Sequence, residues 1–261
     1  MNIKCIATAL AAFLLSGSIA FAADKPLKIG VSAGPYGDIL RETAKIAAKE
    51  GLVAEIVEFT DWTQVNEALQ AGDIDANNFQ HEPYLENQKK QRGYTIIPLV
   101  PSIVVPTGLY SSKYKSAADI PDGARIGIPN DPTNGARAFF LLEQAGLIKL
   151  KPGTTIAATA RDIAENPKKL TIIELDAAQL PRSLDDLAAA VITLNYAVLS
   201  GLDPKKSLTL EGVESRWTLV WAVRADRKDD ARIRRFIELY RSQPVKEYIL
   251  AKFNGSILPT W

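Results

Sequence analysis

The chain has 261 residues, of which 47% are hydrophobic and 23% charged, and its formal net charge is +1. This composition is typical of a soluble globular protein of one or two domains. Because nucleic acids and anionic membranes attract strongly basic proteins, a chain this close to neutral is not expected to bind either of them.

The first 22 residues have the pattern of a secretory signal peptide. Lys4 supplies a basic start, residues 6–15 are apolar, and residues 20–22 form a small-x-small cleavage site, so we expect cleavage after Ala22. The apolar run is too short to span a bilayer. The only cysteine, Cys5, lies in this segment, so the mature protein would have no thiol and a formal charge of 0. We therefore expect a periplasmic protein.

Within the signal segment, the stretch Leu15-Ser16-Gly17-Ser18 is similar to a lipoprotein cleavage box. Ser18 stands where such a box requires the cysteine that receives the lipid. Without that thiol no lipid can be attached, so the sequence predicts a freely diffusing protein with no lipid anchor.

After the signal segment, strand and helix patterns alternate. The apolar spacing predicts strands at residues 27–31, 53–59, 74–79 and 94–100, and helices at residues 36–49 and 62–70, with a third helix beginning near Pro83. This order of elements is typical of an α/β fold with a mostly parallel sheet that is covered by helices.

A second set of similar units follows residues 104–110. Strands are predicted at residues 124–128, 170–175, 188–194 and 217–224, and helices at residues 132–144, 229–242 and 245–253. Asp131 is the expected N-cap of the helix that Pro132 opens.

We expect two lobes, the first formed by residues 23–105 and 221–261 and the second by residues 106–220. Two crossing segments, near residues 104–110 and 218–224, would join them, so that the C-terminal helices return to the first lobe. Such a topology closes over a ligand by hinge motion, and its binding site lies at the interface of the lobes.

Residues 72–85 hold the only histidine of the chain, His81, between the aromatic residues Phe79 and Tyr84. Strand character gives way here to helical character, so residues 79–81 are predicted to form a strand-to-helix loop. In α/β sheets such loops lie at the carboxyl ends of strands, where ligands bind. A small amphipathic ligand would suit these side chains. Each of them, taken alone, could instead be a core aromatic or a surface histidine.

Three further residues belong to the candidate site. Trp62 comes from the neighbouring loop and helix of the first lobe. Arg137 lies about one and a half turns into the helix that Asp131 caps, where its guanidinium could bind a ligand carboxylate bidentately. Taken alone, Arg137 could equally be a solvent-facing helix residue. Asn195 follows a buried strand and again falls at a carboxyl end.

The sequence gives little support for an enzyme active site, a metal site or a nucleotide-binding site. Gly30 to Gly34 fit the G-x-S-x-G nucleophile pattern around Ser32, but a hydrolase of that type places its histidine late in the chain, and only His81 exists. A tight strand-to-helix turn explains the same glycines. One histidine and no mature cysteine disfavour a metal site, and no phosphate-binding loop occurs. We expect no catalytic residue, no metal and no cofactor.

Six blocks of sequence, taken in order, carry a resemblance to a known family. They are Asn66–Leu69, Gly72–Asn77, Phe79–His81 with Pro83–Leu85, Pro129–Asn134, Glu165–Lys168 and Gln179–Asp186. Together they resemble the NlpA family of substrate-binding proteins, best known as the methionine-binding components of bacterial ABC importers. The resemblance implies a two-lobe periplasmic binding protein (type II-like) with its ligand between the lobes. It also implies an importer permease and ATPase as partners.

The resemblance assigns roles to single residues. Phe79, His81 and Tyr84 match the apolar and aromatic wall that the family builds around the thioether side chain. Trp62 stands where a tyrosine is usual. Arg137 matches the arginine that binds the ligand carboxylate.

Two positions depart from the family pattern. Thr193 and Leu219 stand where the family usually has asparagines that help to fix the amino-acid head group. Leu219 cannot hydrogen-bond an ammonium or a carboxylate through its side chain, and the loss of such a partner would cost about 1–3 kcal/mol. Asn195 could partly compensate. The predicted ligand is therefore methionine or a related apolar or sulfur-containing carboxylate, with a carboxylate that lacks a free ammonium as the alternative.

Two other classes of protein stay open at this point. An exported hydrolase would use Ser32 and would lose its activity in a Ser32→Ala variant. A surface adhesin or signalling protein would use the same fold to present a bound ligand, and its deletion would cause no growth defect on that ligand.

Overall fold

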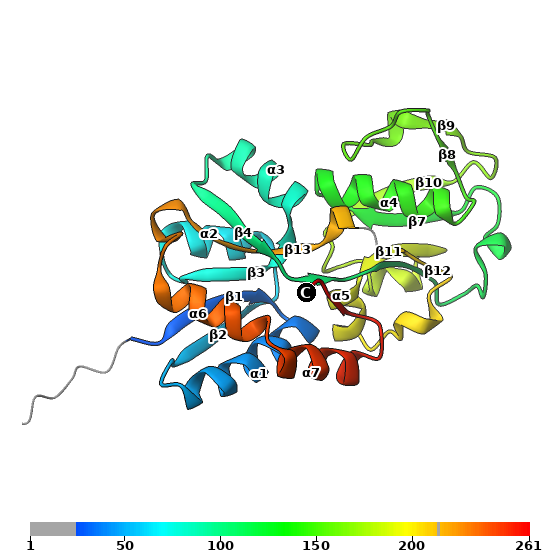
Figure 1. Ribbon diagram of the computed structural model, residues 1–261. Coiled ribbons are helices and arrows are strands. Elements are labelled where there is room, and N and C mark those ends of the chain that lie inside the picture. Colours follow the sequence, from blue (N-terminus) through cyan, green and yellow to red (C-terminus); the bar gives the residue numbers. More distant parts are fainter. Residues whose placement is uncertain (1–24, 213–214) are drawn as a thin grey trace, which may run out of the picture.

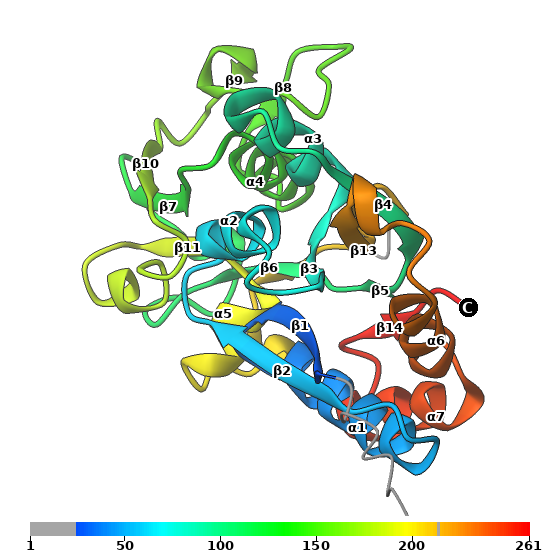
Figure 2. The same cartoon turned by 90° about the vertical axis from the view of Figure 1, so that its left-hand side faces the viewer.

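The chain builds two lobes, each around a five-stranded sheet. The computed structural model describes residues 25–212 and 215–261, so the predicted signal peptide and lipoprotein box lie outside the described residues. The first sheet has the order β2–β1–β3–β13–β4 and the second the order β10–β7–β11–β6–β12. Figures 1 and 2 show the two lobes side by side, with helices packed around each sheet.

The first sheet is mixed and mostly parallel. Its strands are β1 (Leu27–Ser32), β2 (Ala54–Phe59), β3 (Ala76–His81), β4 (Ile96–Pro101) and β13 (Leu219–Arg224). Strands β2, β1 and β3 run parallel, whereas β13 is antiparallel to both β3 and β4.

The second sheet repeats this plan. Its strands are β6 (Thr107–Tyr110), β7 (Arg125–Pro129), β10 (Thr171–Leu175), β11 (Ala189–Thr193) and β12 (Thr209–Leu210). Strands β10, β7 and β11 run parallel, and β6 is antiparallel to β11 and β12. Two small antiparallel pairs complete the strands: β5 (Ile103–Val104) with β14 (Leu258–Pro259), and β8 (Lys149–Leu150) with β9 (Ile163–Glu165).

Seven α-helices surround the sheets in the described part of the chain. They are α1 (Pro35–Lys49), α2 (Thr63–Ala71), α3 (Glu82–Arg92), α4 (Pro132–Gln144), α5 (Leu194–Leu199), α6 (Ala231–Tyr240) and α7 (Gln243–Phe253). In α1, Ile39 and Leu40 are buried whereas the next residue, Arg41, is exposed, as expected for a helix that packs one face against a core. Among the described helices, none is long and apolar enough to cross a bilayer.

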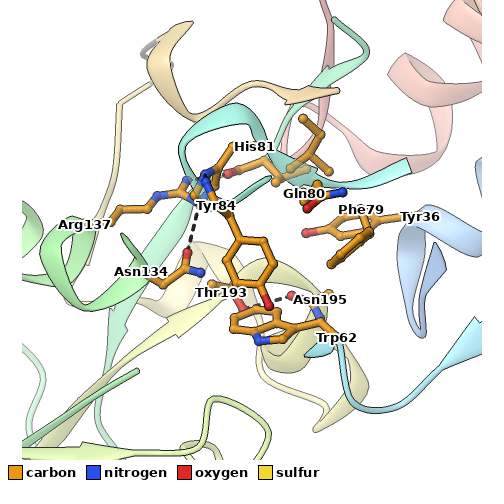
Figure 3. A pocket seen from close by; sticks show the side chains of 12 residues that line it. Tyr36, Trp62, Phe79, Gln80, His81, Tyr84, Asn134, Arg137, Thr193 and Asn195 are labelled. Atoms are coloured by element: carbon orange, nitrogen blue, oxygen red, sulfur yellow. Dashed lines mark hydrogen bonds between the residues drawn. The ribbon is translucent and has the colours of Figure 1, made fainter. Parts of the chain in front are cut away.

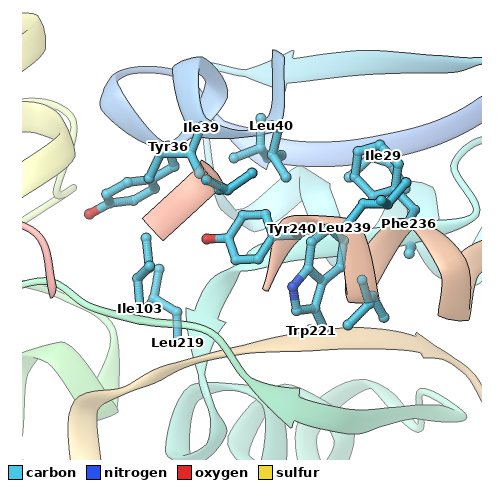
Figure 4. Packing of buried hydrophobic residues seen from close by; sticks show 14 of the residues in the cluster. Ile29, Tyr36, Ile39, Leu40, Ile103, Leu219, Trp221, Phe236, Leu239 and Tyr240 are labelled. Carbon is cyan, nitrogen blue, oxygen red and sulfur yellow. The ribbon is translucent and has the colours of Figure 1, made fainter. Parts of the chain in front are cut away.

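The C-terminal helices return to the first lobe, as predicted. Phe236 of α6 and Ile249 of α7 belong to the same buried cluster as Ile29 of β1. Trp221 of β13 lies within this cluster, with its ring centroid 5.9 Å from that of Phe236 and 5.1 Å from that of Tyr240 (Figure 4). This core holds the two distant parts of the chain together.

The second lobe has a core of its own. Ile126 and Ile128 of β7, Val191 of β11, and Phe139 and Leu142 of α4 form a separate buried cluster. The two clusters share no residue.

Two segments connect the sheets. The first leads from β4 through β5 and Val105 to β6, and the second leads from β12 to β13. Strand β14 pairs with β5, with Leu258 opposite Val104, so the C-terminal end braces the first connection (Figure 2). The predicted two-lobe α/β architecture is confirmed. The lobe boundaries at residues 105 and 221 stay a prediction, and β13 begins at Leu219.

One local prediction is wrong. Phe79, Gln80 and His81 do not form a loop, because they are the last three residues of β3 and α3 begins at Glu82. The strand passes directly into the helix because His81 keeps an extended backbone and caps α3 with its own side chain.

Candidate functional site

A small pocket with a cavity volume of about 30 Å³ lies between the lobes. Its walls are Tyr36, Trp62, Phe79, Gln80, His81, Tyr84, Val105, Asn134, Arg137, Thr193, Asn195 and Leu219 (Figure 3). The structure thus brings all the residues of the predicted site to one place. Tyr36, Val105 and Asn134 are additional wall residues for which sequence analysis proposed no role, and Gln80 was noted only as part of the predicted loop.

The first lobe contributes an aromatic wall from the end of β3 and the first turn of α3. The rings of Phe79 and Tyr84 meet edge to face with centroids 6.1 Å apart, and Trp62 lies 6.2 Å from Tyr84. Burial raises the pKa of Tyr84, so its hydroxyl stays protonated. That hydroxyl makes no hydrogen bond within the described residues, although it is buried.

His81 is not a surface histidine, since its exposed fraction is only 3%. The backbone N–H of Tyr84 donates to Nδ1 at 3.1 Å, so the ring proton lies on Nε2 and is donated to Oδ1 of Asn134 at 3.2 Å. Burial, with a smaller contribution from the charge of Arg137, lowers the pKa of His81 to about 3. The imidazole is therefore neutral at physiological pH.

The second lobe holds Asn134 at the start of α4. Asp131 is the N-cap, as predicted, and accepts the backbone N–H groups of Thr133 at 3.2 Å and Asn134 at 2.9 Å. Its other carboxylate oxygen accepts Nδ2 of Asn134 at 3.0 Å. The cap thereby orients the Asn134 amide so that Oδ1 faces His81.

Arg137 lies one turn further along α4 and is 3% exposed. Its Nε donates to both carboxylate oxygens of Glu211 at 2.9 and 3.0 Å, and its Nη2 donates to Glu211 and, at 2.8 Å, to the carbonyl of Val105. Nη1 makes no hydrogen bond among the described residues. No sequence pattern indicates Glu211 as the partner of Arg137, because the two residues are 74 positions apart in the chain.

Trp217 connects the two halves of the site. Its ring centroid lies 5.0 Å from that of His81 in the first lobe, and the guanidinium of Arg137 in the second lobe stacks over it at 5.2 Å. Trp217 is the first residue of the last strand predicted from the sequence, and no sequence pattern assigns it a role. The long-range contacts of a buried tryptophan depend on how the lobes meet, and no local pattern reveals them.

The two departures from the family pattern lie on opposite sides of the pocket. Thr193 ends β11, and its hydroxyl donates to Oδ1 of Asn195 at 2.9 Å. Nδ2 of Asn195 is buried and makes no hydrogen bond within the described residues. Leu219 begins β13 opposite His81. An unpaired buried donor costs about 1–3 kcal/mol, so a ligand oxygen beside Asn195 would be favoured.

A second contact between the lobes lies beside the pocket. The hydroxyl of Tyr196, in α5, donates to the carbonyl of Thr60 at 3.1 Å, and its ring lies 5.1 Å from that of Trp62. The lobes are therefore in contact on both sides of the pocket.

Comparisons with known proteins agree on one family. The model described as NlpA lipoprotein matches residues 27–261. The chain is 44% identical over 239 residues to the D-methionine-binding lipoprotein MetQ of Escherichia coli (strain K12), which covers 90% of this chain and 88% of that protein. The chain belongs to the NlpA lipoprotein family.

Solved structures with the NlpA fold superpose closely on this chain. A nutrient binding protein from Burkholderia cenocepacia bound to methionine has a TM-score of 0.86 and 47% identity, covering 90% of this chain and all of that one (100%). A periplasmic substrate-binding protein of an ABC transporter from Coxiella burnetii has a TM-score of 0.86 and 43% identity, with the same coverage of 90% and 100%.

Membership of the NlpA family confirms that the chain is a binding protein and not an enzyme. The structure also argues against a hydrolase that uses Ser32, because both ring nitrogens of His81 are already hydrogen-bonded, one to Tyr84 and the other to Asn134. Gly34 has a φ of 118°, which favours glycine, and a side chain there would meet the Asn195 carbonyl at 3.3 Å. Gly34 lies in the turn from β1 into α1, whereas Gly30 lies within β1 itself. Within the described residues, no cluster of histidine, cysteine and acidic side chains could hold a metal.

The NlpA family and the relative from E. coli are both described as lipoproteins. The family therefore does not support the predicted absence of a lipid anchor. Ser18 stands where the lipoprotein box predicted from the sequence would need a cysteine.

Proposed function

We propose that this chain is the substrate-binding component of an ABC importer and that it captures methionine, or a related small sulfur-containing carboxylate, between its lobes. The observation that carries the proposal is the pocket itself, which places a buried aromatic wall opposite a single guanidinium. The D-methionine-binding lipoprotein of E. coli, the B. cenocepacia protein bound to methionine and the ABC-transporter protein of C. burnetii support the same substrate and the same partners.

The aromatic wall suits the side chain of methionine. Phe79, Tyr84 and Trp62 would surround the thioether, and sulfur–aromatic contacts are favourable by about 0.3–1.5 kcal/mol each. Neutral His81 adds a polarizable ring without adding a charge. A charged side chain would lose its hydration in this part of the pocket, so the wall favours an apolar tail.

The opposite side of the pocket suits the head group. We assign the ligand carboxylate to Nη1 of Arg137 and to Nδ2 of Asn195, which are hydrogen-bond donors without partners in the described residues. The ligand ammonium would donate to the oxygens of Thr193 and Asn195, each of which keeps a free lone pair. These contacts replace the head-group partner that Leu219 cannot supply.

Calorimetric titration of refolded, ligand-free protein tests the proposal. L-methionine, D-methionine and the des-amino analogue 4-(methylthio)butanoate are compared, and we expect saturable binding of L-methionine at a single site. Absence of binding by all three compounds would refute the proposal.

A carboxylate without an ammonium group is the second candidate. Leu219 favours it, because its buried apolar side chain lines the pocket and cannot accept a hydrogen bond from an ammonium. If the des-amino analogue bound more tightly than either enantiomer of methionine in the same titration, this candidate would replace the first.

We also propose that the mature protein is free in the periplasm, without a lipid anchor. Ser18 has no thiol to which a lipid could be attached. Labelling of expressing cells with radioactive fatty acid should leave the wild type unlabelled, whereas a Ser18→Cys variant should take up label if residues 15–18 otherwise form a working box. Label on the wild type would show that the proposal is wrong.

A further inference from the structure

Glu211 is a buried carboxylate that lies behind the pocket and not in its wall. Its side chain is 9% exposed and forms an ion pair with Arg137. It is also tied to the first connection between the lobes, since its backbone N–H donates to the Thr107 carbonyl at 2.9 Å and its carboxylate accepts the Thr107 N–H at 3.2 Å. Glu211 is therefore held in one position relative to Arg137.

This ion pair sets the charge of the pocket. Of the described side chains that line it, only that of Arg137 is charged, and Glu211 neutralises that charge from behind. His81 adds none, because burial keeps its imidazole neutral. A zwitterion therefore enters a pocket with no net charge and adds no net charge to it. A simple carboxylate would leave one negative charge uncompensated in a dry site, which is costly.

The ion pair also limits how a ligand can approach the guanidinium. Nε and Nη2 are engaged by Glu211 and Val105, so the fork formed by those two nitrogens is not open to a second carboxylate. The bidentate contact that the sequence suggested is thus made with Glu211. A ligand carboxylate meets Arg137 at Nη1 only.

We propose that Glu211 is a positioning residue that makes the site select zwitterionic amino acids over carboxylates without an amino group. It acts through Arg137, by holding the guanidinium and by cancelling its charge. The inference rests on the proposed function, because it assumes that the ligand binds in this pocket.

The test compares L-methionine with 4-(methylthio)butanoate by calorimetric titration, in the wild type and in Glu211→Gln. The wild type should bind methionine more tightly than the acid. In the variant, the ratio of the dissociation constant of the acid to that of methionine should fall by about tenfold or more, since close buried charges are coupled at least that strongly. An unchanged ratio, with both ligands weakened alike, would overturn the inference.

Two further variants separate charge from packing. Glu211→Asp keeps the carboxylate, so the ratio should stay within about threefold of the wild type, because a shorter carboxylate still compensates Arg137. Glu165→Gln removes a carboxylate from an exposed ion pair with Lys149, at 2.8 Å, and should leave both affinities unchanged. A loss of selectivity in Glu211→Asp as large as in Glu211→Gln would point to packing and would overturn the inference.

Failure of the inference can be told from failure of the proposed function. If the wild type binds methionine and the ratio does not move in Glu211→Gln, only the inference fails; if the wild type binds neither ligand, both fail. Should Glu211→Gln be unfolded without ligand, thermal melting is repeated with each compound at millimolar concentration. The concentrations at which the acid and methionine restore a cooperative transition should then differ less than the two dissociation constants do in the wild type. A difference as large as in the wild type, or no restoration by either compound, would overturn the inference.

Discussion

His81 links the two lobes through its own ring. It takes one hydrogen bond from the α3 backbone and gives one to Asn134 of α4, 53 residues later in the sequence. The sequence identified His81 as a site residue because it is the single imidazole and lies between Phe79 and Tyr84. It could not identify Asn134 as the partner, because that contact exists only when the lobes are placed together.

The titration of His81 follows from its burial. Its pKa is lowered from the ordinary value of 6.5 to about 3, so the folded protein takes up this proton at a lower pH than the unfolded chain does. The contribution of neutral His81 to the free energy of unfolding is therefore fully present above pH 6.5. It is lost as the pH falls from 6.5 toward 3, by up to about 1.4 kcal/mol per pH unit.

Nuclear magnetic resonance of the one imidazole checks this prediction. The ring should keep the signals of the neutral Nε2–H form between pH 8 and 5, and His81→Gln should remove the corresponding slope from the free energy of unfolding. A midpoint near pH 6.5 in the folded protein would contradict the account.

Helix α4 carries both Asn134 and Arg137, so the start of this element sets the geometry of the second lobe's wall. The residues Pro129 to Asn134 predicted its first turn correctly, since a capping aspartate before a proline is a local signal. The start of α3 was harder to predict. Pro83 is the second residue of that helix and not the first, because His81 takes the N-cap position and ends β3 at the same time.

Removal of the α4 cap should weaken both the fold and the site. Asp131→Ala loses the hydrogen bonds to two backbone N–H groups and should lower the free energy of unfolding by about 1 kcal/mol. It also releases the amide of Asn134, so ligand affinity should fall.

Chemical denaturation and calorimetry measure the two effects of Asp131→Ala. Asp203→Ala is the matched control, because Asp203 caps only a single 3-10 turn, at residues 204–206. It should leave ligand affinity unchanged. Equal affinity in the wild type and Asp131→Ala would show that the cap does not position the site.

At the scale of the whole molecule, two lobes with separate cores meet along the pocket. The alternation of strands and helices predicted this architecture, because each half has its own set of α/β units. The Arg137–Glu211 pair and the contacts of Trp217 could not be predicted in the same way. They join residues that are distant in sequence, and charge or hydrophobicity alone does not say which partner a residue meets.

The contact between Tyr196 and Thr60 should stabilise the closed arrangement of the lobes. Tyr196→Phe removes a hydrogen bond worth about 0.5–1.5 kcal/mol, so ligand affinity should fall by a few-fold up to about tenfold. Tyr110→Phe is the control, because the buried hydroxyl of Tyr110 makes no hydrogen bond within residues 25–212 and 215–261. Calorimetry of both variants should show a loss only for Tyr196→Phe, and equal losses would exclude a closing role.

Native mass spectrometry of the protein purified from its own cells, without denaturation, tests the central claim most directly. We predict that a fraction of the protein carries one bound molecule with the mass of methionine, and that this molecule is lost on unfolding. A co-purified molecule without a carboxylate would contradict the account, because Arg137 would then face a ligand that it could not hold.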